Sequence, residues 1–253
     1  MAADPRAGWR KWLGRIRPKD RAELTLLVGG VVFLLLILCI SRLASEVFEG
    51  ETQRFDQKIL VSLRSSTDPA VPIGPTWLTN AALDVTALGS ATVLGLVVLA
   101  VGGFLVLQGM WRTGLFVVIA SSGGLFINAA LKHYFQRPRP DIVSHLREVM
   151  TTSFPSGHAL TSAVVYLTLG ALTMRIAKRR ITKFYCMGIA MLTTALVGAS
   201  RVFLGVHYPT DVVAGWMIGL SWALLCWLVE RSLERRSGWT RERAEAEASE
   251  RAP

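Results

Sequence analysis

Six long apolar runs constrain this chain more than any other feature of its sequence. They lie at approximately 24–43, 90–107, 114–131, 159–174, 184–199 and 212–229. An apolar run of about 18 residues or more is typical of a helix that crosses a bilayer. The fourth and fifth runs are short for a span, and we interpret them as spans whose polar ends lie just inside the membrane face. The sequence therefore predicts an all-α fold, a bundle of six transmembrane helices.

Charged residues are concentrated at the ends of these runs. The chain has 253 residues and a net charge of +10, but its basic residues form neither one face nor one stripe, so a nucleic-acid partner is disfavoured. A six-helix path places three basic groups on one side: 1–23, 175–183 and 231–236. The positive-inside rule makes that side cytoplasmic and leaves three segments on the outer side: 44–89, 132–158 and 200–211. We expect a bacterial cytoplasmic membrane, with both termini in the cytoplasm.

The same pattern predicts the organisation of the chain. We expect a basic cytoplasmic segment, a membrane domain and a charged cytoplasmic tail, in residues 1–23, 24–230 and 231–253. In the first outer segment, Phe55, Ile59 and Leu63 repeat at helical spacing among charged residues, which predicts a helix lying in the membrane interface. Residues 77–88 predict a second such helix. Whether these two helices form a lipid gate or a cover over the bundle stays open.

The stretch from Ser200 to Asp211 carries an arginine, a histidine and an aspartate between two apolar runs. Pro209 suits the first turn of a helix, so one turn would bring the Asp211 carboxylate beside the His207 imidazole. A carboxylate on one ring nitrogen fixes the tautomer and leaves the other nitrogen free as a nucleophile or base. Arg201 supplies a planar fork of donors that suits phosphate. Taken alone, the spacing also fits a polar loop with a capping Asp and a solvated Arg.

Two cations follow the third apolar run. Lys132 and Arg139 lie seven residues apart and offer a point charge and a fork to one anion. Arg137, between them, either contacts phosphate or is solvated. Ordinary flanking charge is the alternative for the other two, although the positive-inside rule weakens it on an outer loop.

Pro155-Ser156-Gly157-His158 runs straight into the fourth apolar run. Free backbone N–H groups and the dipole at a helix start can hold a phosphate, and glycine lets the backbone approach it closely. His158 would stand beside that phosphate, where an imidazolium can protonate a leaving oxygen. Taken alone, the segment also fits a helix N-cap followed by an interfacial histidine.

Together these segments resemble the type 2 phosphatidic acid phosphatase family, integral membrane lipid phosphatases related in fold to the soluble vanadium haloperoxidases. The family pattern is a Lys, six residues and Arg-Pro; then Pro-Ser-Gly-His; then Ser-Arg, five residues, His, three residues and Asp. Every element is present here, in order and with the same spacing. The resemblance covers about residues 90–229, and the first helix, the long outer segment and both termini lie outside its motifs.

The resemblance implies a role for each matched residue. The phosphate ligands would be Lys132, Arg139, Ser156, Gly157 and Arg201. His207 would attack phosphorus and become a transient phosphohistidine, with Asp211 orienting its ring. His158 would protonate the departing lipid oxygen and then activate the water that hydrolyses the intermediate. His133 and His145 stay outside this assignment.

These roles predict a metal-independent enzyme with no cofactor. Charge in phosphoryl transfer accumulates on equatorial oxygens, so positioning and electrostatic stabilisation do most of the work, and three fixed cations can supply both. A neutral His207 and a charged His158 predict a bell-shaped pH profile. The expected substrate is a lipid phosphate in the bilayer: phosphatidic acid, phosphatidylglycerophosphate, a polyprenyl diphosphate or a lipid A phosphate. A lipid phosphotransferase and a non-catalytic transporter of anionic lipids stay open as alternatives.

Overall fold

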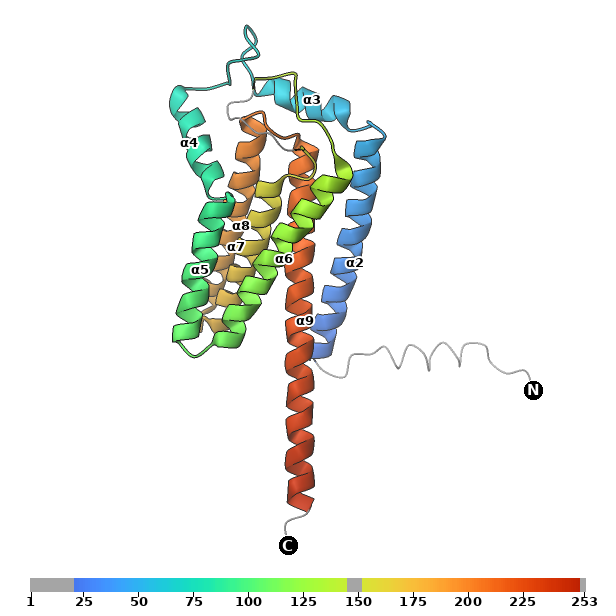
Figure 1. Ribbon diagram of the computed structural model, residues 1–253, viewed down its shortest axis with the longest axis vertical. Coiled ribbons are helices and arrows are strands. Elements are labelled where there is room, and N and C mark those ends of the chain that lie inside the picture. The colour runs from blue at the N-terminus through green and yellow to red at the C-terminus, as the bar shows by residue number, and fades with distance from the viewer. Residues whose placement is uncertain (1–20, 145–151, 251–253) are drawn as a thin grey trace, which may run out of the picture. The chain divides into compact units, whose positions relative to one another are not determined.

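The computed structural model of the chain describes residues 21–144 and 152–250. These residues form eight α-helices and no β-strand (Figure 1). The helices are α2 (Arg21–Phe48), α3 (Gln53–Ser62), α4 (Thr76–Ala87), α5 (Ala91–Leu107), α6 (Trp111–Phe135), α7 (Gly157–Ile176), α8 (Arg180–Phe203) and α9 (Pro209–Glu250). Most of the predicted N-terminal segment, and His145, lie outside the described residues.

The chain divides into two compact units. Residues 36–227 form the larger one, which contains every residue that the sequence assigns to a site. Residues 1–35 and 228–253 form the other, in which the described backbone is helical. The charged tail predicted from residue 231 is thus a continuation of α9, as far as Glu250.

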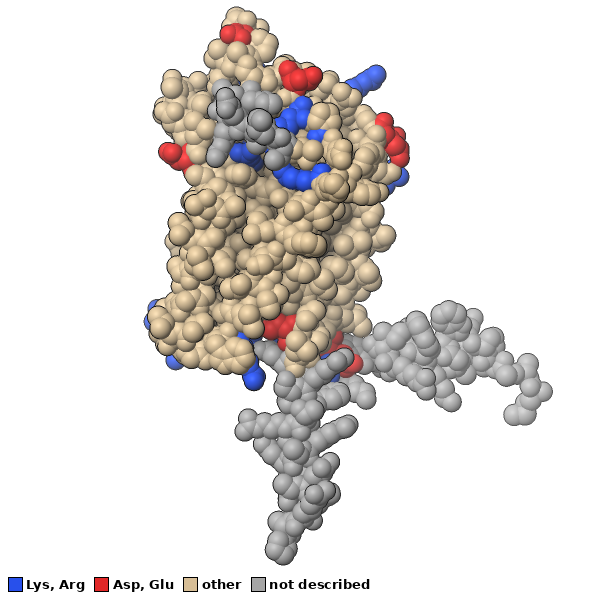
Figure 2. Space-filling view, in the orientation of Figure 1, with Lys and Arg blue, Asp and Glu red and all other residues tan. Residues whose placement is uncertain are grey.

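All six predicted apolar runs fall within helices. Five helices are long and apolar enough to cross a membrane, namely α2, α6, α7, α8 and α9, and α4 with α5 passes the same test as a span broken by a 49° bend. The two short runs belong to longer helices of 20 and 24 residues, because the polar motifs at their ends continue the helical backbone. Figure 2 shows charged side chains at both ends of the spanning helices and a wide uncharged belt between them. The prediction of an all-α membrane bundle is therefore confirmed.

Helix α7 is the centre of the larger unit and contacts α5, α6 and α8. Val165 of α7 packs in one cluster with Leu94 and Val98 of α5. On another face, Leu160 and Val164 pack against Ala214 and other residues of α9. Many of the remaining apolar side chains are exposed, as expected for helices that face lipid on one side and protein on the other.

Helix α9 approaches α7 closely through two glycines one turn apart. A Cβ atom on Gly219 would lie 2.5 Å from the Leu160 carbonyl oxygen and 2.7 Å from the Ala163 Cβ. A Cβ atom on Gly215 would lie 2.7 Å from the Ser156 carbonyl oxygen. Small residues at such positions let two membrane helices pack backbone against backbone. The two glycines therefore set how close the first turns of α7 and α9 lie.

Replacing Gly219 with alanine is expected to destabilise the bundle by about 1–3 kcal/mol, the usual cost of overpacking a close contact. The matched control is Gly95→Ala on α5, where nothing lies within 4 Å of the added Cβ. There the better helix propensity of alanine should leave the thermal midpoint in detergent unchanged or raise it. Equal midpoints for the two variants would contradict the close α7–α9 contact.

The first outer segment contains the two helices that the sequence predicts there. Helices α3 and α4 are joined by a loop that includes an isolated bridge between Arg64 and Pro72. Figure 1 shows α3 lying across the end of the bundle. Its buried residues are Leu60 and Asp56, a carboxylate that the helical pattern placed among solvated charges. The location of these helices in the membrane interface stays a prediction.

Candidate active site

Four helix termini meet at one end of the larger unit: the last turns of α6 and α8 and the first turns of α7 and α9 (Figure 1). Helix α9 begins at Pro209, where the sequence predicts a helix start. Helix α7 begins at Gly157 with Ser156 as its N-cap. The Ser156 amide donates a hydrogen bond of 2.9 Å to the Asp211 carbonyl oxygen, which ties these two helix starts together. Antiparallel helices thus bring the three sequence motifs to one place.

His207 and Asp211 lie side by side and are both buried. The Nδ1 atom of His207 is 3.6 Å from the Asp211 Oδ2 atom. The Ser153 hydroxyl donates to Oδ2 and lies 3.5 Å from Nδ1, and the Tyr208 amide donates to the same oxygen at 2.9 Å. The carboxylate is thereby held beside the ring. A role for Ser153 was not predicted from the sequence, in which its position two residues before Pro155 was the only signal.

Arg139 lies on the opposite edge of the imidazole ring. Its Nη1 atom is 3.2 Å from His207 Nε2. It also donates to the Val206 carbonyl oxygen, and its Nη2 atom donates to that of Thr152 at 3.4 Å. Since a guanidinium can only donate, Nε2 is the accepting nitrogen and the ring proton belongs on Nδ1, toward Asp211. The unprotonated nitrogen therefore points to a cation that suits phosphate.

Two more cations complete a basic cluster. Arg201 is buried, with 1% of its surface exposed, and its Nη1 atom donates to the Thr86 hydroxyl of α4 at 3.1 Å. Lys132 lies close enough to Arg139 and Arg201 to be repelled by both. Repulsion among three clustered cations is relieved by a bound anion. Figure 2 shows basic side chains gathered at this end of the molecule.

The start of α7 offers polar groups to such an anion. The Ser156 hydroxyl is buried and has no hydrogen-bond partner among the described residues. A Cβ on Gly157 would lie 3.0 Å from the Asn128 amide nitrogen, so this backbone is already in close contact with α6. His158 is half-buried in the first helical turn, with its ring packed near Gly89. A buried hydroxyl at a helix N-terminus fits an oxyanion ligand.

The protein environment lowers the pKa of His207 to about 4. Burial has the largest effect because it disfavours the charged imidazolium. The hydrogen bond and charge of Asp211 raise this pKa, whereas the charges of Arg139 and Arg201 lower it. His207 is therefore neutral at pH 7, the protonation state that a nucleophile requires.

Neither sequence interpretation of Arg137 was correct. Its Nη1 atom donates to Asp211 Oδ1 at 2.7 Å, and its Nη2 atom donates to Asp56 Oδ2 at 2.9 Å. The guanidinium also lies 4.2 Å from the centre of the Tyr208 ring. Because both carboxylates are buried, Arg137 is neither solvated nor directed at a free anion. It forms an ion pair with Asp211, and its second ion-pair partner, Asp56, lies on α3, far away in sequence.

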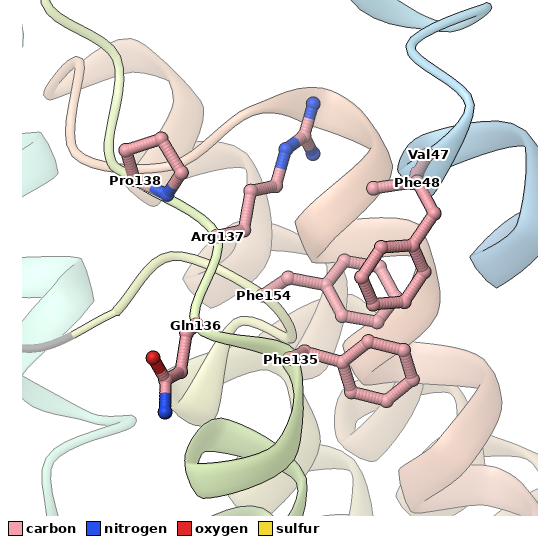
Figure 3. Close-up of a pocket in the computed structure, with 7 residues that line it drawn as sticks. All are labelled: Val47, Phe48, Phe135, Gln136, Arg137, Pro138 and Phe154. Carbon is pink, nitrogen blue, oxygen red and sulfur yellow. The ribbon is translucent and has the colours of Figure 1, made fainter.

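An apolar pocket of about 300 Å³ lies beside the loop that carries Arg137. Figure 3 shows three aromatic rings on one side of it and the Arg137 guanidinium directed away from them. It is lined by Val47, Phe48, Phe135, Gln136, Arg137, Pro138 and Phe154. The ring centre of Phe135 lies 5.0 Å from that of Phe48 and 4.9 Å from that of Phe154. Such a lining suits the apolar part of a ligand.

Two other sequence expectations concern groups outside this cluster. His133 is exposed on the last turn of α6, which agrees with its exclusion from the site. Among the described residues, no three His, Cys, Asp or Glu side chains are placed to hold a metal ion. Metal independence nevertheless stays a prediction for a chelator experiment.

Comparison with known proteins gives consistent results. The profile of the PAP2 superfamily matches residues 111–235. Phosphatidylglycerophosphatase B of Bacillus subtilis is 31% identical over 193 residues, which are 74% of this chain and 88% of that protein. An undecaprenyl-diphosphatase of Sulfolobus acidocaldarius is 34% identical over 44% of this chain and 52% of its own length. The crystal structure of a transmembrane PAP2-type phosphatidylglycerolphosphate phosphatase from Bacillus subtilis aligns with a TM-score of 0.70 and 28% identity, over 79% of this chain and 96% of that one.

Proposed function

The chain belongs to the PAP2 superfamily and is an integral membrane lipid phosphatase, and from this premise we propose which residues perform the reaction and on which lipid. The observation that carries the proposal is the environment of His207. Its Nε2 atom accepts from Arg139 at 3.2 Å, while Asp211 holds the opposite edge of the ring. This arrangement supports His207 as the nucleophile.

The reaction then has two steps. His207 Nε2 attacks phosphorus, the bond from phosphorus to the lipid oxygen breaks, and His158 gives that oxygen its proton. In the second step His158 takes a proton from water, whose oxygen attacks the phosphohistidine. The P–N bond breaks, and inorganic phosphate and neutral His207 are released. Charge on the equatorial oxygens is balanced throughout by Lys132, Arg139 and Arg201, with Ser156 and the Gly157 amide completing the cradle.

We propose phosphatidylglycerophosphate as the first substrate to test. The relative with 31% identity over 74% of this chain is a phosphatidylglycerophosphatase. The apolar pocket lined in part by Val47, Phe135 and Phe154 supports a substrate with an apolar portion. Undecaprenyl diphosphate comes second, because the relative of that specificity matches 44% of the chain.

For the orientation, we propose that the site faces the outer side of a bacterial cytoplasmic membrane and that both termini are cytoplasmic. The connections α5–α6 and α7–α8 lie at the end of the larger unit opposite the site (Figure 1). They and the adjoining helix ends contain Arg112, Arg175, Lys178, Arg179, Arg180 and Lys183. The positive-inside rule assigns such loops to the cytoplasm. The membrane domain, by the same proposal, comprises residues 24–230.

Phosphate release from a panel of lipids tests the proposed function. The purified chain in detergent, with chelator present, is offered phosphatidylglycerophosphate, phosphatidic acid, undecaprenyl diphosphate and a lipid A phosphate. We expect release from phosphatidylglycerophosphate at a rate that chelator and added magnesium leave unchanged, because fixed cations already neutralise the phosphate. Activity that chelator abolishes and magnesium restores would contradict a metal-independent site.

The pH profile tests the protonation state of the nucleophile. With a pKa of about 4, His207 is mostly neutral above that pH and mostly protonated below it. After correction for ionisation of the substrate phosphate, kcat/KM should therefore keep its acid limb near pH 4. The alkaline limb should come from the group that protonates the leaving lipid oxygen. An enzyme-derived acid limb near pH 6.5, the ordinary histidine value, would show that the buried environment does not act on His207.

A further inference from the structure

A fully buried carboxylate on α3 has no role in the reaction described above. Asp56 lies on the helix that crosses the end of the bundle, and its exposed fraction is 0%. Its Oδ1 atom accepts from the Thr210 amide at 3.1 Å. Its Oδ2 atom accepts from the Thr210 hydroxyl at 2.6 Å and from Arg137 Nη2 at 2.9 Å. Both oxygens are therefore bonded to groups that also lie next to Asp211.

The hydrogen bonds continue from Asp56 to the nucleophile. Arg137 donates from Nη1 to Asp211 Oδ1 at 2.7 Å and to the Thr210 hydroxyl at 3.0 Å. The second Asp211 oxygen, Oδ2, is the one beside His207 Nδ1. The two Asp211 oxygens thus have different roles, since one is fixed by Arg137 and the other faces the imidazole. Rotation of the Asp211 carboxylate would break the Arg137 bond and move the oxygen away from His207.

A buried ion pair is by itself weak support for either stability or function, because desolvation offsets much of its attraction. Here the geometry is more specific. Arg137 shares its two terminal nitrogens between Asp56 and Asp211, and its guanidinium rests on the Tyr208 ring at 4.2 Å. Asp56 therefore fixes the Nη2 atom of the guanidinium, and the Nη1 atom can then hold Asp211 in a single orientation.

We propose that Asp56 is a positioning residue for the phosphatase reaction, acting through Arg137 and Thr210 to hold the Asp211 carboxylate, and hence His207, in the orientation for attack. The inference rests on the proposed role of His207 as the nucleophile. It also gives α3 a function beyond covering the bundle, since this helix supplies a part of the catalytic apparatus. Asp56 contacts neither His207 nor the cations of the phosphate cradle, so it should affect the chemical step and leave lipid binding intact.

Asp56→Asn removes the charge and keeps the shape, and it is compared with Asp84→Asn, an exposed carboxylate on α4. We expect Asp56→Asn to lower kcat by about 10- to 100-fold, the range typical when an outer residue that orients a site's ligands through hydrogen bonds is removed. KM should change less than about threefold. Rapid-quench trapping of the phosphohistidine should locate the loss in its formation. Asp84→Asn should match the native chain.

A double-mutant cycle with Arg137→Gln should be non-additive. Asp56→Asn should lower kcat much less once Arg137 is absent.

Native kcat in a folded Asp56→Asn, or additive effects in the cycle, would overturn the proposal. A loss of thermal stability without a kcat change in the folded fraction would likewise make Asp56 purely structural. If Asp56→Asn does not fold, Thr210→Val tests the proposal instead, because it removes only the hydroxyl between Asp56 and Arg137. A native kcat in Thr210→Val would also overturn the proposal. Absence of a phosphohistidine in the native chain would instead overturn the proposed function.

Discussion

Replacement of His207 by alanine should reduce phosphate release by about a thousandfold or more, the largest effect expected of any single substitution in this chain. The imidazole supplies the attacking nitrogen, and alanine offers no substitute for it. Because Arg139, Arg201 and Lys132 are retained, lipid phosphate should still bind. Phosphate release from micelles measures the loss, and a lipid-binding assay with the same protein measures the retained affinity.

His133→Ala is the matched control, since this exposed histidine lies near the same end of the bundle, on the last turn of α6. Its rate should stay within about twofold of native, as usual for a surface substitution away from the site. Rapid quench of the native chain with radiolabelled lipid should trap a base-stable, acid-labile phosphoryl group that His207→Ala lacks. A folded His207→Ala protein that still releases phosphate rapidly would assign the nucleophile to another residue.

The second large effect is expected for Asp211→Asn, which keeps the shape of the side chain and removes its charge. Arg137 donates to Oδ1, so the asparagine would present its carbonyl oxygen there and its amide nitrogen to His207 Nδ1. An amide donor at that place favours the tautomer with the ring proton on Nε2, which blocks the attacking nitrogen. We expect kcat to fall by about 10²- to 10⁴-fold, the range in which loss of a histidine-orienting carboxylate has been found to act.

The control for this substitution is Asp141→Asn, which removes a charge from an exposed position of the α6–α7 connection. It should leave kcat close to native. The Asp211→Asn protein must first be shown to fold, by its thermal midpoint and a single species in detergent, because Ser153 and Tyr208 also bond to this carboxylate. A kcat within a few fold of native in a folded variant would mean that Asp211 does not control the state of His207.

These expectations separate two layers of the site. His207, His158 and the three cations of the cradle would act on the phosphate itself. Asp211, Ser153, Arg137 and Asp56 would hold the nucleophile, and their loss should reduce kcat more than lipid affinity. A comparison of kcat with KM across both sets therefore tests the division.

The sequence determined the membrane helices and the local geometry of its motifs. A bilayer leaves no water for backbone groups, so each long apolar run must be helical, and all six are. Pro209 marks the start of α9, and the spacing of four residues then brings Asp211 beside His207. These features depend on residues within one helical turn or on the surrounding bilayer, so the local sequence pattern is enough to predict them.

The tertiary structure alone decided which partners hold that geometry. Arg137 and Asp56 are 81 residues apart, Ser153 and Asp211 are 58 apart, and Arg201 and Thr86 are 115 apart. Asp56 lies among charged residues on an amphipathic pattern, which is equally typical of a solvated carboxylate. Only the crossing of α3 over the start of α9 buries it and brings Arg137 and Thr210 to both of its oxygens. Helical periodicity records which face of one helix is apolar, whereas the partner of a buried charge depends on where other helices end in space.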